Sequence, residues 1–355
     1  MRSWGIMLAV GLLLTVLIGV AALGTAVQAD APAARWAAGP PSGAADTTYT
    51  IVSNTLPYTT PILIDDSRYY DKTCFNIRTL TVYRAVRGGV PLENQPVIFF
   101  VHGGGWTDGY MSWYDFVSRA FTGEMGWVTV VIDYRLTANE VTLSEGCAAL
   151  QPAHALTATK AAWYPDNIRD VAAALQWTVD HIAEYGGNPD QIIVFGHSAG
   201  GHLVSLLATH PAYAALRPAI KGVVSMSGAY SVKDMSSIFN EAINQTWRGG
   251  ITDTAALDEG SPTTYVTAGA SLPPFYLLHC QFDLPSLPEQ AIVFDNKLDL
   301  LGFAVERDYL PGYPHVSEIT ATEFITAEPT VLIVGFVRKT LWPYKVYLPL
   351  AVRGR

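Results

Sequence analysis

A serine stands between two glycines in "QIIVFGHSAGGHLV", residues 191–204. Gly196, Ser198 and Gly200 have the G-x-S-x-G spacing, and the segment passes from an apolar, strand-like run into a helical pattern. Glycine is needed beside such a serine because a Cβ there would collide with the neighbouring strand or helix. A serine at the tip of this turn exposes its hydroxyl, so we interpret Ser198 as a nucleophile. The alternative is a small residue at a tight turn.

A serine hydroxyl needs a base to take its proton and an acid to orient that base. In a strand–turn–helix arrangement of this kind, both partners follow the serine, the acid first. Asp283 comes just after an apolar run that ends at Cys280, and His315 lies in "PGYPHVSE" after the next run. We therefore expect Ser198, Asp283 and His315 to form a catalytic triad. The other candidates lie inside predicted elements or in the wrong chain order: Asp295, Asp299, Asp308, His154, His181, His210 and His279.

The segment "HGGGW" (102–106) also follows an apolar run. Glycines let backbone N–H groups approach an oxygen that becomes negative during acyl transfer, and the N–H of Ala199 would complete such an oxyanion hole. We expect His102 to hold the loop by hydrogen bonds and take Trp106 as a candidate substrate contact. A metal site built from His102, His197 and His202 is disfavoured, because no neighbouring carboxylate or cysteine completes the ligand set.

Short runs rich in Val, Ile and Phe alternate with stretches of helical period. The candidate catalytic residues follow the short runs, so a sheet made of these runs would position them. Continuous apolarity is typical of strands buried on both faces, hence of a mostly parallel sheet. The pattern predicts a three-layer α/β sandwich with its chemistry at the carboxyl ends of the strands. The runs span 96–101, 127–134, 191–196, 220–228, 273–280 and 303–310, and the helices 167–186 and 288–302.

Residues 231–272 interrupt this alternation, and the family resemblance described next implies a small lid here. Phe239, Ile243 and Trp247 recur there at helical spacing, so they either line a pocket or pack on the core, and we favour packing. A second insertion, 137–163, follows "DYRL" and makes substrate preference hard to predict.

Five ordered motifs, "FFVHGGGW", "VVIDYRL", "GGNPDQIIVFGHSAGGHL", "LLHCQFD" and "GYPH", resemble the α/β-hydrolases of the esterase and lipase group. That group includes hormone-sensitive-lipase-like enzymes and bifunctional carbohydrate esterases. The resemblance implies Ser198 as nucleophile, Asp283 as acid and His315 as base. It also implies the backbone of Gly104, Gly105 and Ala199 as the oxyanion hole. Relatives often have a glycine directly after the histidine that precedes the acid, where this chain has Cys280 after His279.

We expect the N-terminus to act as an export signal of one of two kinds. Arg2 precedes an uncharged apolar run from Trp4 to Val27, followed by small residues around Ala29. This run predicts a signal peptide over 1–29 or an uncleaved membrane anchor. We expect a linker at 30–48, a catalytic domain at 49–343 and a short tail at 344–355.

Three cysteines in an exported chain allow one disulfide. We favour Cys74–Cys147, because Cys280 ends an apolar strand. Three free thiols are the alternative.

The chain has 355 residues, with 22 basic against 31 acidic side chains, so nucleic acid is an unsuitable partner. The predicted chemistry needs no cofactor and no metal. We expect a secreted serine carboxylesterase acting on short acyl or carbohydrate-linked esters, in contact with a membrane only if the N-terminal segment is uncleaved. An amidase, a peptidase and a non-catalytic binding module are the alternatives. The sequence leaves the oligomeric state open.

Overall fold

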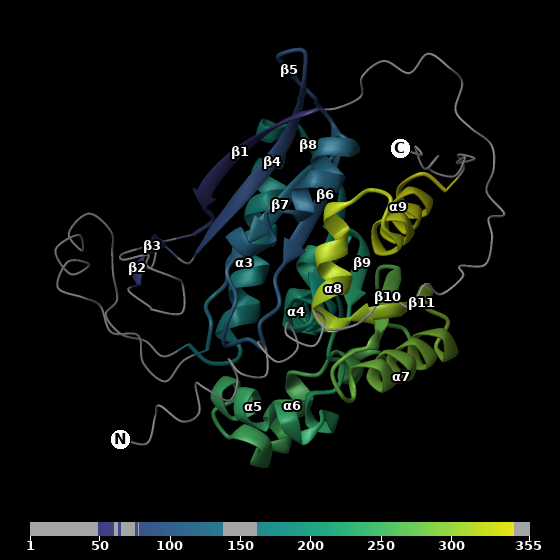
Figure 1. The fold of residues 1–355 in the computed structure, drawn as a ribbon. Coiled ribbons are helices and arrows are strands. Elements are labelled where there is room, and N and C mark those ends of the chain that lie inside the picture. The colour runs from purple at the N-terminus through teal and green to yellow at the C-terminus, as the bar shows by residue number, and fades with distance from the viewer. Residues whose placement is uncertain (1–48, 60–62, 65–74, 77, 138–161, 344–355) are drawn as a thin grey trace, which may run out of the picture. The chain divides into compact units, whose positions relative to one another are not determined.

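The computed structural model describes residues 49–59, 63–64, 75–76, 78–137 and 162–343 (Figure 1). The predicted leader, linker and tail lie outside these residues, and so do Cys74 and Cys147 of the predicted disulfide. Across the described residues, no single helix is both long and apolar enough to cross a membrane; His315–Glu323 and Glu328–Leu341 meet that test only as a pair, bent by 68°.

The strands of the main sheet in this part of the chain are β1 (Thr50–Pro57), β4 (Thr79–Arg87), β5 (Val90–Pro91), β6 (Gln95–Val101), β7 (Val128–Ile132), β8 (Gly187–His197), β9 (Ile220–Met226), β10 (Phe275–Phe282) and β11 (Val305–Pro314). Their order is β1-β4-β7-β6-β8-β9-β10-β11, with β5 paired to β4. From β7 to β11 all neighbours are parallel, whereas β1, β4 and β5 are antiparallel additions. A separate two-stranded sheet joins β2 (Leu63–Ile64) and β3 (Phe75–Asn76). The predicted mostly parallel sheet is confirmed.

The central strands are buried because they carry apolar side chains on both faces. All five residues of β7 are buried, and so are the six that follow Gln95 in β6. Side chains buried on both faces require a layer on each side of the sheet.

The helices are α3 (Asp166–His181), α4 (Ala199–Thr209), α5 (Asn240–Thr246), α6 (Thr254–Glu259), α7 (Leu287–Leu300), α8 (His315–Thr320) and α9 (Glu328–Leu341). Shorter 3-10 or π segments are η2 (Met111–Tyr114), η3 (Arg119–Glu124), η5 (Ile182–Tyr185), η6 (Pro211–Ala219), η7 (Val232–Asp234), η8 (Ser237–Phe239), η9 (Gly250–Thr252), η10 (Pro262–Tyr265) and η11 (Ala321–Glu323).

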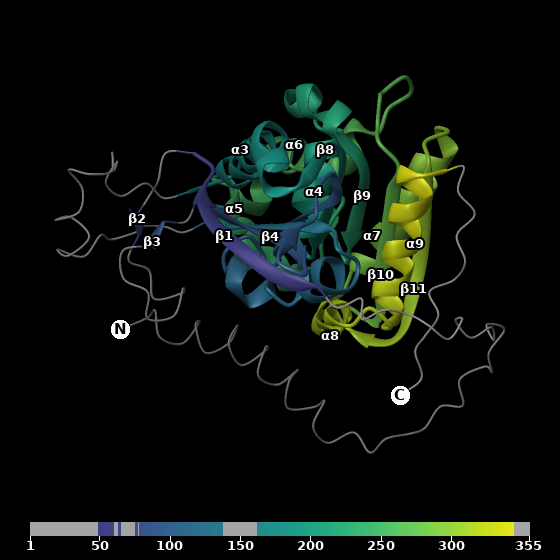
Figure 2. The same cartoon turned by 90° about the horizontal axis from the view of Figure 1, so that it is seen from above.

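Adjacent residues of β10 identify the two outer layers, because successive side chains of a strand point to opposite faces. Phe275 packs edge-to-face on Phe294 of α7, and Tyr276 stacks on Phe336 of α9. Helices α7 and α9 therefore cover opposite faces. Figure 2 shows α3 and α9 well apart, with β8 and β9 between them in that view. The fold is the predicted three-layer α/β sandwich.

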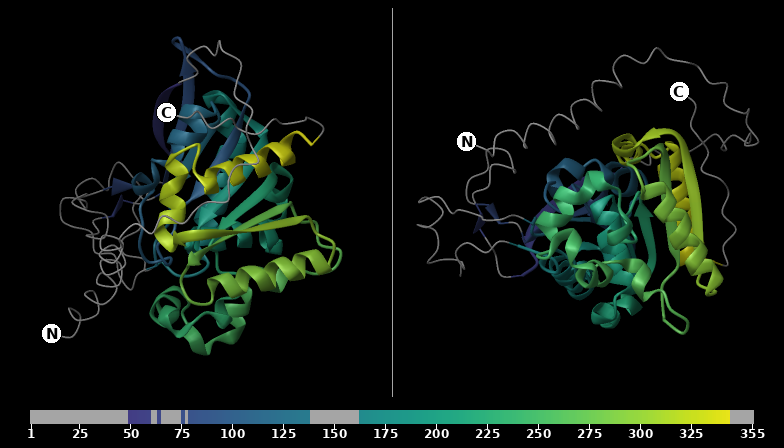
Figure 3. Two further views of the ribbon diagram at one scale, coloured as in Figure 1. Left: turned by 45° about the vertical axis from the view of Figure 1, so that its right-hand side comes forward. Right: turned by 90° about the horizontal axis from the view of Figure 1, so that it is seen from below.

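The segment expected to be a lid forms short helices, including α5 and α6. They lie beyond one end of the sheet, the lower end in Figure 1, and are green in Figure 3. Ile243 is 2% exposed and Trp247 1% exposed, and Phe239 packs partly buried against the core. The expectation that these side chains pack on the core is confirmed.

Candidate active site

Ser198 lies at the turn between β8 and α4 with φ 56° and ψ −121°, a backbone conformation that residues with a Cβ rarely adopt. Its N–H donates to the carbonyl of Met226 at 2.8 Å, which fastens the turn to β9. A Cβ on Gly196 would lie 2.2 Å from the carbonyl oxygen of Gly200, and one on Gly200 would lie 2.0 Å from that of Val101. Both glycines are therefore required for this turn, as the sequence predicts.

Asp283 and His315 meet because β10 and β11 are parallel neighbours that end together. Phe282, the last residue of β10, pairs with Pro314, the last residue of β11. The residue after β10 is Asp283 and the residue after β11 is His315. Asp283 Oδ1 and His315 Nδ1 are 2.6 Å apart. The strand continues to Pro314 and α8 begins at His315, so the expected loop before the histidine is shorter than the sequence indicates.

The carboxylate of Asp283 has no exposed side-chain surface and accepts three hydrogen bonds. Besides His315, the Ser227 hydroxyl donates to Oδ2 at 2.6 Å, and the Leu284 N–H donates to Oδ1 at 2.7 Å. Burial raises the pKa of this carboxyl, but the bonds from His315, Ser227 and Leu284 outweigh burial and hold the pKa below its usual value. Asp283 is thus a charged acid held in place from three sides.

The competing acids have other partners. Asp295 pairs with the guanidinium of Arg307 at 2.8 Å, and Asp308 accepts a hydrogen bond from the Tyr276 hydroxyl at 2.6 Å. These contacts give both residues a structural role and leave Asp283 as the carboxylate that contacts His315.

His197 connects the serine turn to the histidine segment. Its Nε2–H donates to the backbone carbonyl of His315 at 2.9 Å, and the two rings lie 4.7 Å apart between centroids. Burial, followed by the neighbouring charge of His315, lowers the pKa of His197 to about 3, so this ring stays neutral. A Cβ on Gly103 would lie 3.1 Å from His197 Nδ1, which places the glycine loop against the same ring. One buried imidazole thus contacts all three segments.

The glycine loop adopts conformations that suit glycine. Gly104 has φ 118° and Gly105 has φ 60°, and a Cβ on Gly104 would lie 1.9 Å from the carbonyl oxygen of Asp108. His102 holds this loop as predicted, with Nδ1 2.7 Å from the Gly103 carbonyl oxygen. Burial lowers the pKa of His102 to about 4, so it donates as a neutral ring. The oxyanion role of Gly104, Gly105 and Ala199 stays a prediction.

Trp106 is 1% exposed, and its indole N–H donates to His202 Nδ1 at 3.0 Å. The other ring nitrogen of His202 donates to the carbonyl of Gly260 at 2.7 Å. Both nitrogens of His202 are therefore engaged, and the Trp106 indole packs edge-to-face on Trp247. This packing favours a structural role for the Trp106 side chain, whose predicted contact with substrate stays a prediction.

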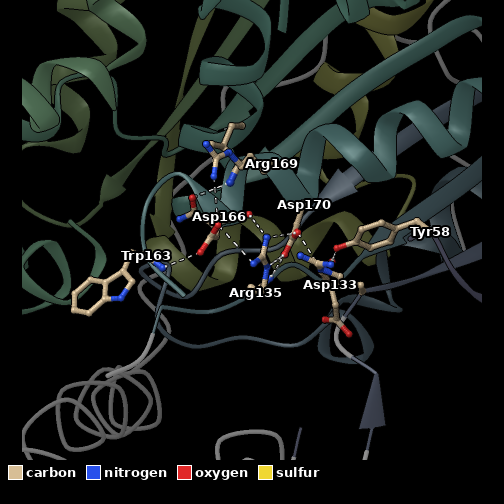
Figure 4. A network of polar contacts seen from close by, with 10 residues as sticks. Tyr58, Asp133, Arg135, Trp163, Asp166, Arg169 and Asp170 are labelled. Carbon is tan, nitrogen blue, oxygen red and sulfur yellow. Dashed lines mark hydrogen bonds and ion pairs between the residues drawn. The ribbon is translucent and has the colours of Figure 1, made fainter. Parts of the chain in front are cut away.

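An ion-pair network braces the edge of the sheet where β7 ends (Figure 4). Arg135 binds Asp170 of α3 through two nitrogens, at 2.7 and 2.9 Å, and lies 3.6 Å from Asp166. Arg78 approaches the same Asp170 at 3.2 Å. Nearby, the Tyr58 hydroxyl donates to the backbone carbonyl of Asp133 at 2.8 Å. The network ties α3 to the segments beside the glycine loop.

Sequence reasoning missed two residues beside the triad, Ser227 and Glu318. Ser227 follows β9 and has φ 47°. Glu318 lies one helical turn after His315 and is 0% exposed. No local pattern signals either, because each acquires its role only when β9, β10 and α8 come together.

A separate cavity of about 600 Å³ lies at the amino ends of β8 to β11, beside Lys221 and Phe336, on the edge opposite the predicted triad.

Comparisons with known proteins find similar sequences among ester hydrolases. Residues 139–298 match the BD-FAE family model. The chain is 28% identical over 268 residues to the probable carboxylic ester hydrolase LipM of Mycobacterium tuberculosis, an alignment that covers 66% of this chain and 57% of LipM. It is 32% identical over 250 residues to esterase LipQ of the same organism, covering 65% and 52%. The chain spans about half the length of these curated relatives.

Solved esterase structures show the same fold. Carboxylesterase EstE1, cloned from a metagenomic library, superposes with a TM-score of 0.58 at 20% identity, covering 75% of this chain and 85% of that one. Esterase B from Lactobacillus rhamnosis superposes with a TM-score of 0.60 at 19% identity, covering 82% and 86%. The chain thus has the α/β-hydrolase fold, and in sequence it is similar to esterases and carboxylic ester hydrolases.

Proposed function

We propose that the chain is an exported serine carboxylesterase that hydrolyses esters of short acyl groups, including esters carried on carbohydrates. The observation that carries the proposal is the 2.6 Å contact between the buried Asp283 carboxylate and His315 Nδ1. That contact orients the imidazole, and His197 connects the His315 segment to Ser198. The ester hydrolase relatives support the substrate class.

In the proposed reaction, Ser198 attacks the ester carbonyl while His315 takes its proton. The backbone N–H groups of Gly104, Gly105 and Ala199 bind the oxygen that becomes negative, and the N-terminus of α4 adds to that field. His315 then donates its proton to the departing alcohol. Water, activated by the same histidine, cleaves the acyl-enzyme. Asp283 keeps its charge throughout and stabilises the imidazolium.

Substitutions at the triad test the proposal. Ser198→Ala should lower kcat/KM for p-nitrophenyl esters by about three orders of magnitude or more while the protein stays folded. Asp283→Asn should also reduce the rate strongly, whereas Asp295→Asn and Asp308→Asn should leave it near the unmodified level. If Ser198→Ala retained activity within about tenfold, or if Asp295→Asn were the impaired variant, the assignment would be wrong.

The substrate class is tested with a panel. p-Nitrophenyl esters of rising chain length, acetylated xylan, a feruloyl ester and a matched anilide should show hydrolysis of the short and carbohydrate-linked esters. Faster cleavage of the anilide would identify an amidase instead.

Export is tested separately by N-terminal sequencing of the exported protein. A start near Asp30 would support a cleaved leader, and an intact Met1 on a membrane-bound protein would support the anchor. A protein confined to the cytoplasm would overturn both.

A further inference from the structure

Glu318 is a buried carboxyl group that the proposed mechanism does not use. It lies in α8, three residues after His315, and its side chain is 0% exposed. Neither carboxyl oxygen has a hydrogen bond of normal geometry, and the polar groups against it are the Ser227 hydroxyl and the Cys280 thiol. A carboxyl buried in this way is costly when charged.

Among the residues that the structure describes, none beside Glu318 supplies a positive charge that would offset this cost. His197 Nε2 is 3.6 Å from Glu318 Oε1, but that ring is neutral and donates to the His315 carbonyl. The titratable and charged groups that face Glu318 from the elements packed on it are Asp283, Cys280, His197, His315 and Tyr230. Apart from His315 during the reaction, none of these carries a positive charge.

Asp283 is the second buried carboxyl in this cluster. One oxygen of Asp283, one oxygen of Glu318 and the sulfur of Cys280 all lie within 4.8 Å of one another. Two carboxyl groups this close inside a protein do not both ionise, because their charges repel where water cannot screen them. Asp283 accepts three hydrogen bonds that favour its charged form, whereas neither oxygen of Glu318 accepts a hydrogen bond of normal geometry. The proton of the pair therefore resides on Glu318, and burial and the Asp283 charge raise the pKa of Glu318 well above its usual value.

We propose that Glu318 is a positioning residue of the triad: it keeps the proton that the two buried carboxyl groups share, and so confines the negative charge to Asp283, opposite His315. A carboxyl oxygen of Glu318 and ring nitrogens of His315 and His197 also lie within 4.8 Å of one another. An ionised Glu318 would therefore place a second negative charge, besides that of Asp283, beside the His315 imidazole. When Asp283 is made neutral, Glu318 becomes free to ionise and supplies the missing charge from that side.

A double-mutant cycle on ester hydrolysis tests this role, which rests on the proposed function. Glu318→Gln keeps a neutral side chain at this position, and its kcat/KM relative to the unmodified protein gives the first leg of the cycle. In the Asp283→Asn background, Glu318→Gln should remove at least about a further tenfold, because the substitute charge is lost. Glu323→Gln, on the neighbouring segment beside Arg119, is the matched control and should be neutral in both backgrounds. Equal rates for Asp283→Asn and the double variant would overturn the proposal, and so would a loss in Glu318→Gln as large as that of Asp283→Asn.

Thermal unfolding gives a readout that does not depend on activity. An acid that stays protonated in the folded protein, but ionises near its ordinary pKa once unfolded, makes the protein less stable as pH rises between those two pKa values. Glu318→Gln should therefore gain Tm relative to the unmodified protein from pH 5 to pH 8, by about 2 °C per pH unit. Glu323→Gln should show no such gain. A constant difference for Glu318→Gln would mean that Glu318 ionises normally, which overturns the proposal. If the unmodified protein hydrolyses no ester, the proposed function fails and this measurement alone decides the role of Glu318.

Discussion

Replacing Ser198 by glycine should stabilise the protein relative to replacing it by alanine, although both variants lose the proposed nucleophile. The φ of 56° and ψ of −121° at Ser198 are imposed by its surroundings. Its N–H is bound to Met226, and α4 is pressed so closely on β6 that a Cβ on Gly200 would lie 2.0 Å from a backbone oxygen. Alanine keeps the Cβ and the strain, whereas glycine has no Cβ to strain.

The size of the effect follows from two opposing contributions. A residue with a Cβ in a sparsely populated backbone region costs about 1–3 kcal/mol. Glycine also lowers the free energy of unfolding by about 0.4–1 kcal/mol, because an unfolded chain with glycine has more conformations to lose on folding. The free energy of unfolding of Ser198→Gly should therefore exceed that of Ser198→Ala by about 1 kcal/mol, which raises Tm by about 2 °C in a domain of this size.

The assay is thermal unfolding of the two variants in the same buffer. Ser205 provides a control, because it lies inside α4 and its backbone is helical. There the order should reverse, with Ser205→Ala more stable than Ser205→Gly by about 1 kcal/mol. If Ser198→Gly proved no more stable than Ser198→Ala while the control behaved as expected, the turn would not be strained and the explanation of the serine's exposure would fail.

Two further predictions concern buried histidines and the glycine loop. Burial lowers the pKa of His202 to about 4. Between about pH 6.5 and pH 4, the unfolded chain therefore binds a proton at this histidine and the folded protein does not. The free energy of unfolding falls as the pH drops through this range. His202→Gln should flatten this fall by about 1.4 kcal/mol per pH unit, as measured by denaturant unfolding at several pH values; an unchanged slope would show that His202 is charged in the folded protein. Gly103→Ala would place a Cβ 3.0 Å from the His197 carbonyl oxygen and 3.1 Å from the Ser198 Cβ. It should lower kcat for ester hydrolysis by about a hundredfold with a small change in Tm, and unchanged kinetics would show that the loop position is unimportant.

The sequence was sufficient to place the central strands and the triad candidates, because both depend on local signals. Strands β6 to β10 each contain an apolar run, and the glycine loop, the serine turn and the acid follow the carboxyl ends of β6, β8 and β10. Chain order then selects Asp283 and His315, which the paired ends of β10 and β11 bring into contact.

The features that the sequence did not predict depend on tertiary contacts. Strand β1 is largely exposed along its length and has no apolar run to reveal it; it is defined by pairing with β4. Glu318 looks like an ordinary surface residue in "HVSEIT", and its burial results from packing of α8 against Cys280 and His197. The buried position of Trp106 likewise depends on His202 and Trp247, which are distant in the chain.

The two bonds of His202 have a consequence for how this fold can be altered. They join α4 to Trp106 of the glycine loop on one side and, on the other, to Gly260 of the segment expected to be a lid. The lid segment is therefore fixed to the catalytic core through buried polar contacts, and it cannot swing away without leaving an imidazole nitrogen and a carbonyl unpaired. Exchanging this segment with that of a relative therefore requires the exchange of His202 and Trp106 as well.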